Sequence, residues 1–586
     1  MSRSERWGIS AAKTDAFIKG IAAHPYVCAL LVCLLLNPFY LGAAENVPPN
    51  ALYMESFGVL LTVLIGIYIM YKRGKIGKIQ ACVFGLSAAF LDYVGAKRFS
   101  QATDKGLWML VGGIAVVSVL YACANTDKFQ TQLNALFIFA IGFLVKFHYV
   151  FNTSVYTRQN DVHVFGGDSG HAAYMEYLIA HRALPNFDVR EVWQFCHPPL
   201  HHIICAFWID INENVLGVGH NPARESLQTL TLFYAMCIMI TAYKLLRRFK
   251  LQNMALYVPL LMISFHPAFI LMSGAINNDV LSVAFMMGAV LFTLNWYDSQ
   301  TYTNILKIAL CVGLGMMTKL SAAIVAPAIA LVFLAVFIKK IRIDWLRLIG
   351  QFAAFGAVCV PLGLWFEIRN YIKWKVPITY VQEMPNTVTQ YIGDRSFKDR
   401  LTDFSSEQFK SVFEQWLSYD DKGELTGYNE YNPIIALFKN SLFSESVNET
   451  TFENTPYMLT AARVFFWLGI ALAAVFLLLM VVMLVKKCEM KPVEKTLFGF
   501  FYISLIFNYF KMCHDYPFTC TMNFRYITPT VIITSIFCGL FMNIRKNNEH
   551  PCAVKAVSAV LTVLVGAFCV LSVITYIAIC APVITE

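Results

Sequence analysis

Long apolar segments recur through almost the whole sequence, and they restrict the chain to a fold built inside a membrane. Each run is about 15–25 residues long, enough for one α-helix to cross a hydrocarbon core of about 30 Å. The chain is 58% hydrophobic and only 14% charged, whereas about a quarter of the residues in soluble domains are charged. The sequence therefore predicts an all-α polytopic membrane protein. We expect about fifteen spans of this length, near residues 25–43, 57–71, 79–95, 107–124, 132–151, 226–245, 255–275, 280–297, 305–317, 321–338, 347–366, 460–485, 495–511, 527–544 and 555–580.

Lysine and arginine gather in short clusters at the ends of alternate predicted spans, at residues 72–78, 247–250, 339–342, 486–487 and 545–546. Because such clusters are retained on the cytoplasmic side of a membrane, they place all these ends inside the cell. We expect a cytoplasmic N-terminus, in the plasma membrane or the endoplasmic reticulum. The polar segments on the outer or lumenal face are then 152–225, 276–279, 367–459 and 512–526. The net charge of +9 resides in these clusters, so we expect contact with membrane lipids and no nucleic-acid partner.

The sixteen cysteines are mostly scattered through apolar segments, where a thiol behaves as a small hydrophobic group. No pair has the spacing of a zinc site, so neither a metal site nor a disulfide framework is predicted from them. Cys513 and Cys520 share one polar segment, and they are the pair that we would test for a disulfide.

The predicted outer segment 152–225 carries more ionisable side chains than a membrane anchor requires. A carboxylate held beside an apolar wall is a reasonable general base, because partial desolvation raises its pKa towards neutrality. Asp161 and Asp168 are both candidates for this base. His171 follows Asp168 by one helical turn, so both side chains face the same point, and histidine and arginine can hold an anionic group such as phosphate. We expect a short interfacial helix over residues 170–181 and a second one after Pro198-Pro199.

Five further motifs lie on the same predicted face or at its edge. The first is His197-Pro-Pro-Leu, which is followed by His201 and His202. The others are Asn-Asn-Asp at 277–279, Gly-Leu-Gly-Met-Met-Thr-Lys at 313–319, Trp-Phe-Glu-Ile-Arg-Asn at 365–370, and Asn-Phe-Arg-Tyr at 523–526. One site assembled outside the bilayer would explain why these motifs share a face.

The order of these motifs resembles the GT-C superfamily of polyprenyl-phosphate-sugar-dependent glycosyltransferases. The similarity is to the branch of protein O-mannosyltransferases and lipid A aminoarabinose transferases. In that branch an outer acidic motif, a juxtamembrane helix and a Lys- or His-Pro-Pro-Leu element follow one span, and here 168–171, the 170–181 helix and 197–200 match them. The later Asn-Asp, Thr-Lys, Arg-Asn and Arg-Tyr elements also match, so the resemblance covers about residues 130–545.

The resemblance implies an enzyme that transfers a sugar from a polyprenyl (dolichyl or undecaprenyl) phosphate to a lipid, glycan or protein acceptor, with inversion. Asp161 or Asp168 would be the general base, and the donor phosphate would be held by His171, His197, Lys319, Arg369 and Arg525. Further expected site residues are His201, His202, Asn278, Asp279 and Tyr526. No cofactor is required and no metal ligands are assigned, because fixed cations are available; use of a divalent cation stays open.

The resemblance also suggests a division of the chain into four parts: a four-span extension (1–130), a GT-C-like catalytic core (131–380), an outer insert or lid (381–459) and C-terminal spans (460–586). Two other functions stay open. A polytopic secondary transporter would place its ionisable residues near the bilayer midplane, and a non-catalytic lipid-binding protein would tolerate alanine at the aspartates.

The charge pattern makes a direct prediction of topology. Single cysteines introduced into 72–78, 247–250 or 339–342 should resist an impermeant maleimide applied from the outer side only, whereas cysteines introduced into 152–225 should react. Labelling of the basic clusters from outside, together with protection of 152–225, would contradict the assigned orientation.

Overall fold

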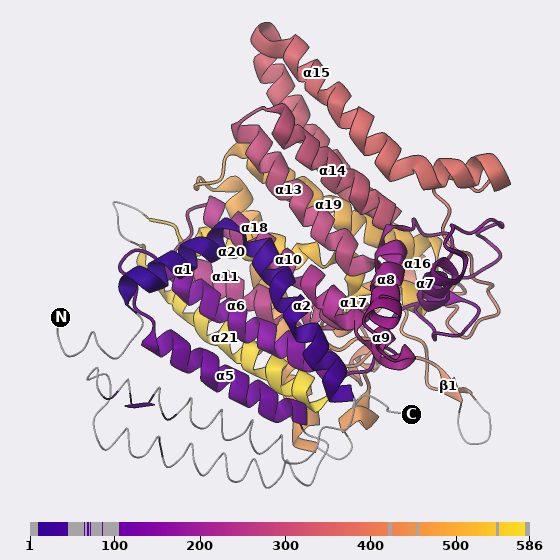
Figure 1. Ribbon diagram of the computed structural model, residues 1–586, viewed down its shortest axis with the longest axis horizontal. Helices are drawn as coiled ribbons and strands as arrows, with labels where there is room; N and C mark the ends of the chain where they lie inside the picture. The colour runs from indigo at the N-terminus through magenta and orange to yellow at the C-terminus, as the bar shows by residue number, and fades with distance from the viewer. Residues whose placement is uncertain are drawn as a thin grey trace.

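The computed structural model describes residues 10–44, 64, 67–68, 71, 85, 105–419, 425–445, 447–452, 456–545 and 550–579. Within these ranges the chain is a bundle of α-helices (Figure 1), which confirms the predicted all-α class. The described strands are two short ones, β1 (Ser418–Tyr419) and β2 (Leu425–Thr426), which form an antiparallel hairpin. The predicted spans near 57–71 and 79–95 lie outside the described residues, apart from isolated positions.

The described helices have the length and apolarity that a membrane requires. Seven of them can cross a bilayer, and the number rises to ten if each of three bent helix pairs forms one span. Large apolar side chains such as Leu478, Phe507 and Val563 are exposed on the outside of the bundle. Exposure of such side chains to water is unfavourable, whereas lipid accommodates them. The chain is an integral multi-pass membrane protein.

The N-terminal helices cover one side of the bundle. They are α1 (Ala11–Ala23), α2 (Pro25–Ala44), α5 (Lys105–Cys123) and α6 (Gln130–Phe151). Helix α2 packs on α10 (Leu227–Arg248), while α5 packs on α6. In Figure 1 these helices lie beside α21 (Cys552–Ala578) on the side of the bundle away from α15.

Two short helices follow α6, as predicted for the segment 152–225. Helix α7 (Gly170–His181) has the expected bounds, and α8 (Leu200–Asp210) begins directly after Pro199. Ser169 precedes α7 but does not cap it through its side chain, because its hydroxyl contacts His163 Nδ1 at 2.9 Å. Tyr174 on α7 is fully buried against Phe195 and His202, so this face of the helix packs on protein rather than lipid. A π-helical turn (Ile211–Val215) and α9 (His220–Glu225) lead to α10.

The central helices break where the site forms. Helices α11 (Met254–Phe265) and α12 (Pro267–Gly274) meet at a 46° bend before Pro267, whose ring cannot donate a backbone hydrogen bond. Helices α13 (Asp279–Asp298) and α14 (Tyr302–Thr318) are followed by a 3₁₀ turn (Leu320–Val325) and by α15 (Ala326–Trp374). Helix α15 has non-helical backbone at Asp344, between the predicted spans 321–338 and 347–366.

The insert between α15 and the last spans is folded against the bundle. It contains α16 (Phe397–Thr402), the 3₁₀ turns Ser406–Phe409 and Glu449–Phe452, and α17 (Pro433–Phe443). Buried Arg400 donates to the carbonyls of Tyr431 (3.0 Å) and Cys513 (2.9 Å), which ties the insert to α19. The last helices are α18 (Pro456–Val485), α19 (Pro492–Asp515), α20 (Pro529–Met542) and α21, with the 3₁₀ turns Thr519–Thr521 and Phe524–Ile527 between α19 and α20.

Candidate functional site

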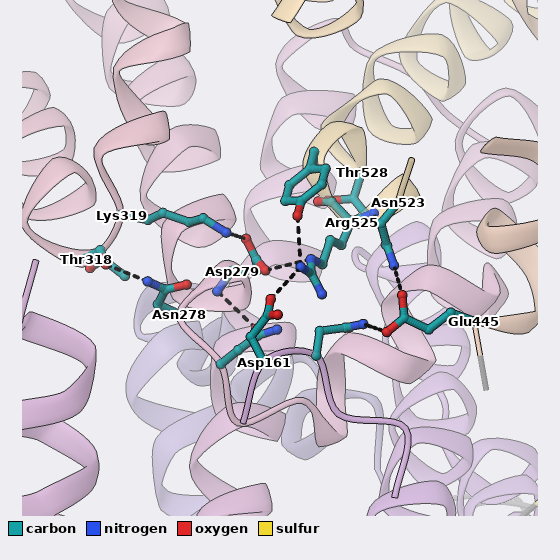
Figure 2. A network of polar contacts seen from close by, with 12 residues as sticks. Asp161, Asn278, Asp279, Thr318, Lys319, Glu445, Asn523, Arg525 and Thr528 are labelled. Carbon is teal, nitrogen blue, oxygen red and sulfur yellow. Dashed lines mark hydrogen bonds and ion pairs between the residues drawn. The ribbon is translucent and has the colours of Figure 1, made fainter. Parts of the chain in front are cut away.

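Four segments that are distant in sequence meet where these helices begin or end. Asp279 is the first residue of α13, where the positive end of the helix dipole favours a carboxylate. Lys319 has extended backbone between α14 and the following 3₁₀ turn, and Arg525 lies in the turn before α20. Asp161 belongs to the loop before α7. Figure 2 shows the four side chains pointing towards one another.

The loop that carries Asp161 is held by the start of α7. The backbone of Asp161 is left-handed (φ 60°), a conformation that aspartate tolerates better than most residues. The carbonyls of Asp161 and Val162 accept hydrogen bonds from the backbone N–H groups of His171 (3.1 Å) and Ala172 (3.0 Å). The helix therefore fixes the position from which the Asp161 side chain extends.

Cations and carboxylates alternate in this cluster. Arg525 Nη2 lies 2.8 Å from Asp161 Oδ2, and Arg525 Nε lies 3.3 Å from Asp279 Oδ2. Lys319 Nζ donates to the other oxygen of Asp279. The exposed fractions of the side chains are 34% for Asp161 but only 9% for Asp279, 11% for Arg525 and 14% for Lys319. Asp161 is thus the member that a molecule entering from solvent can reach most easily.

Tyr526 completes the cationic side of the cluster. Its hydroxyl accepts a hydrogen bond from Arg525 Nη2 at 2.8 Å, and Lys319 Nζ lies 5.2 Å from the centre of its ring. A cation over an aromatic face is attracted by the ring quadrupole. Tyr526 therefore contacts both cations that Asp279 holds together.

Glu445, which follows α17 in the insert, extends the network. Its Oε1 accepts from Asn160 Nδ2 at 2.6 Å, and its Oε2 accepts from Asn523 Nδ2 at 3.0 Å (Figure 2). Asn523 begins the Asn-Phe-Arg-Tyr motif at 523–526, whereas no motif in the sequence singled out Glu445. Only the fold brings the insert to the residues that precede Asp161 and Arg525.

A small cavity of about 40 Å³ lies beside Arg525, with room for little more than water. Its polar lining comes from Arg158, Asn160, Asn277, Asp279, Asn440, Ser444, Asn523, Arg525 and Thr528. With Arg158 included, three cationic side chains and three carboxylates gather in this region. The protein itself therefore supplies carboxylates that compensate the charges of these cations.

The expected histidines form a neighbouring group of neutral rings. His171 Nδ1 and His202 Nε2 are 2.8 Å apart, and the rings of His171 and His197 stack with centroids 5.4 Å apart. Burial lowers the pKa of His197 to about 4, and the positive charge of Lys319 adds to this. Burial also lowers the pKa values of His171 and His202 well below the usual range. As neutral rings, His171 and His197 do not add to the positive charge of Lys319 and Arg525, and their role in holding a donor phosphate stays a prediction.

Two other expected site residues orient the backbone around the cluster. His201 Nε2 donates to the carbonyl of Ile276 at 2.8 Å, which joins α8 to the segment leading to Asp279. Burial lowers the pKa of His201 to about 4, so it holds this contact as a neutral ring. Asn278 Nδ2 donates to the carbonyl of Thr318 at 3.2 Å, and this fixes the start of α13 beside Lys319.

Asp168 and Arg369 lie apart from the cluster. Asp168 is exposed and forms no hydrogen bond or ion pair with the described part of the chain. Arg369, on α15, donates to the carbonyl of Pro185 and to Asn370 Oδ1 (3.0 Å), and it lies over the Trp374 ring at 5.0 Å. Its guanidinium thus joins α15 to the segment after α7 and does not face Lys319 or Arg525.

The two cysteines that the sequence offered for a disulfide are not bonded to each other. Cys513 and Cys520 are free thiols. Across the described ranges, no three His, Cys, Asp or Glu side chains are arranged to hold a metal ion.

Comparison with known proteins gives one family match. Residues 197–365 match the family model of dolichyl-phosphate-mannose-protein mannosyltransferases. This confirms the resemblance to the mannosyltransferase branch over that segment, which includes His197, Asp279 and Lys319 and excludes Asp161 and Arg525. No curated protein sequence matches the chain.

Among solved structures, the chain is similar to the crystal structure of ArnT from Cupriavidus metallidurans bound to undecaprenyl phosphate. The two share 11% sequence identity over 76% of this chain and 75% of that one, with a TM-score of 0.41.

The shared carboxylate of Asp279 predicts a large effect on stability. Asp279→Asn leaves Lys319 and Arg525 side by side with little solvent, and we expect it to lower the free energy of unfolding by about 3–5 kcal/mol. The matched control is Asp298→Asn at the other end of α13. Asp298 also pairs with two cations, Arg248 and Lys491, but its side chain is 44% exposed, so we expect a small change.

Thermal unfolding of the purified protein in detergent measures both effects. The double variant Asp279→Asn/Lys319→Met should regain part of the loss, because it removes one of the two uncompensated cations. Equal losses for Asp279→Asn and Asp298→Asn would contradict the bridging role of Asp279.

Proposed function

We propose that this protein is a membrane glycosyltransferase that moves a sugar from a polyprenyl phosphate to an acceptor hydroxyl on the outer or lumenal face. The observation that carries this proposal is the cluster in which Asp161 is paired with Arg525, and Arg525 shares Asp279 with Lys319. A reachable carboxylate next to two fixed cations suits a reaction that removes a proton and releases a phosphate. The family match over residues 197–365 supports the same class of reaction.

The reaction we propose is a single displacement with inversion. Asp161 takes the proton of the acceptor hydroxyl as its oxygen attacks the anomeric carbon of the sugar. The bond between that carbon and the phosphate oxygen breaks, and polyprenyl phosphate leaves with the bonding electron pair. Lys319 and Arg525 stabilise the negative charge that grows on this phosphate, which is where electrostatic catalysis is most effective.

The ion pair between Asp161 and Arg525 supports an order of events for this reaction. Arg525 Nη2 binds Asp161 Oδ2 at 2.8 Å. A donor phosphate that binds the Arg525 guanidinium competes for these N–H donors, since phosphate and carboxylate prefer the same bidentate geometry. Donor binding would therefore release Asp161 to act as a base only when the sugar is present.

A secondary transporter is the alternative that this site supports less well. A transporter needs its ionisable residues near the middle of the spans, where both faces can reach them. Asp279, Lys319 and Arg525 instead stand at the beginnings or ends of helices that meet the outer segment with Asp161. This arrangement favours chemistry at one membrane face.

The assignment of the base predicts a difference between the two aspartates. Asp161→Asn should lower turnover by about 10²–10⁴-fold, the usual effect of losing a general base. Asp168→Asn should have a much smaller effect, because this side chain contacts none of the cluster. The matched family makes dolichyl phosphate mannose the first donor to test, with lipid, glycan and protein hydroxyls as acceptors.

The measurement is transfer of radiolabelled sugar by purified variants of equal expression and thermal stability. Activity lost in Asp168→Asn and kept in Asp161→Asn would move the base to Asp168. Full activity in both variants would contradict the proposed enzyme mechanism.

A further inference from the structure

The insert contributes a carboxylate to the site through Glu445. This residue is two positions beyond the end of α17, in a part of the chain that the matched family segment does not include. Its two carboxylate oxygens are each used by a different segment. Asn160 binds one oxygen at 2.6 Å, and Asn523 binds the other at 3.0 Å.

Each asparagine that Glu445 holds is adjacent to a member of the ion pair. Asn160 immediately precedes Asp161. Asn523 lies two residues before Arg525, and its side-chain oxygen accepts the backbone N–H of Arg525 at 3.0 Å. One carboxylate therefore sets the positions of both Asp161 and Arg525 (Figure 2).

Glu445 is itself held firmly. The N-terminus of α17 is tied to α19 by the hydrogen bond from the Tyr509 hydroxyl to the Pro433 carbonyl, at 2.7 Å. Lys439 on the same helix forms a fully buried ion pair with Glu430 at 2.6 Å. Asn440 Nδ2 also donates to the carbonyl of Met522, next to Asn523, at 3.3 Å. These contacts leave the end of α17 little freedom, so Glu445 can act as a fixed point.

We propose that Glu445 is a positioning residue that holds Asp161 and Arg525 in their reactive arrangement and adds a negative charge beside Asp161. This inference rests on the proposed function, in which Asp161 is the base and Arg525 binds the donor phosphate. It extends the active site into the outer insert.

The electrostatic role of Glu445 depends on the ionisable groups that face its carboxylate. Removal from water raises the pKa of Glu445, while Arg525 lowers it and the negative charge of Asp161 raises it. Glu414 and the Cys520 thiol also face Glu445. Burial raises the pKa of Glu414 well above its usual range, and burial likewise raises the pKa of Cys520, to about 12. Both shifts favour the neutral forms of these two groups, so the ion pair that faces Glu445 is the one between Asp161 and Arg525.

Replacement of Glu445 by glutamine tests both the positioning role and the electrostatic role of this residue. The glutamine amide presents one acceptor and one donor, so one of the two asparagine amides loses its partner. We expect turnover to fall by up to about 100-fold, the order of loss caused by a small misplacement of a catalytic group. Removing a negative charge next to a general base moves the acidic limb of a pH–rate profile to lower pH, and we expect this shift in Glu445→Gln.

Two further variants separate position from charge. Asn160→Ala removes one contact and keeps the charge of Glu445, so turnover should fall while the acidic limb stays in place. The control is Glu449→Gln in the same insert, whose exposed side chain pairs with Arg463, and neither quantity should change. Direct binding of polyprenyl phosphate should weaken in Glu445→Gln and in Asn523→Ala, because both variants loosen Arg525.

The outcomes separate this inference from the proposed function. The role of Glu445 would be overturned if Glu445→Gln kept the turnover, the acidic limb of the pH–rate profile and the polyprenyl phosphate binding of the wild type. This holds even if Asp161→Asn is inactive. Activity in Asp161→Asn would instead overturn the base assignment, and the binding measurement would still test whether Glu445 positions Arg525. If Glu445→Gln fails to fold, Asn160→Ala and Asn523→Ala test the same contacts, and unchanged turnover and binding in both would overturn the proposal.

Discussion

The carboxylate of Asp279 forms the contacts on which this end of the bundle depends. Its two oxygens hold Lys319, from the break after α14, and Arg525, from the turn before α20. Both cations have little contact with solvent, so without this shared anion their repulsion would be only weakly screened. The position of Asp279 at the start of α13 supplies further compensation, because the helix dipole favours negative charge there. The start of α13, the end of α14 and the turn before α20 are thereby joined at one point.

Asp161 occupies the open side of this arrangement and connects it to solvent. Asp161 and Asp279 already pair with Arg525, so under the proposed function a donor phosphate would compete with Asp161 for the N–H donors of Arg525. This competition would couple donor binding to the release of the base. Three parts of the chain that are far apart in the sequence affect this competition for Arg525. They are the loop before α7, the start of α13 and the insert with Glu445.

Much of the fold could be predicted from the sequence, because the length of an apolar run and the positions of proline are local signals. Helices α7 and α8 and the break in α15 at Asp344 are examples. Asp279 and the two cations that it contacts, Lys319 and Arg525, each belong to a motif that the sequence places at the end of a predicted span. The neutrality of His171 and His197 could not be predicted, since it depends on how deeply α7 and α8 bury them. Two contacts were likewise not predictable from the sequence. Arg369 binds the carbonyl of Pro185 instead of the cluster, and Glu445 binds Asn160 from an insert in which we found no motif.

The most direct test of the central claim is a structure of the protein with a polyprenyl phosphate bound. We predict that phosphate oxygens lie within hydrogen-bonding distance of Lys319 and Arg525, and that Asp161 has separated from Arg525 and faces the sugar position. A phosphate bound elsewhere, for example beside Arg369, with the ion pair between Asp161 and Arg525 intact, would contradict it.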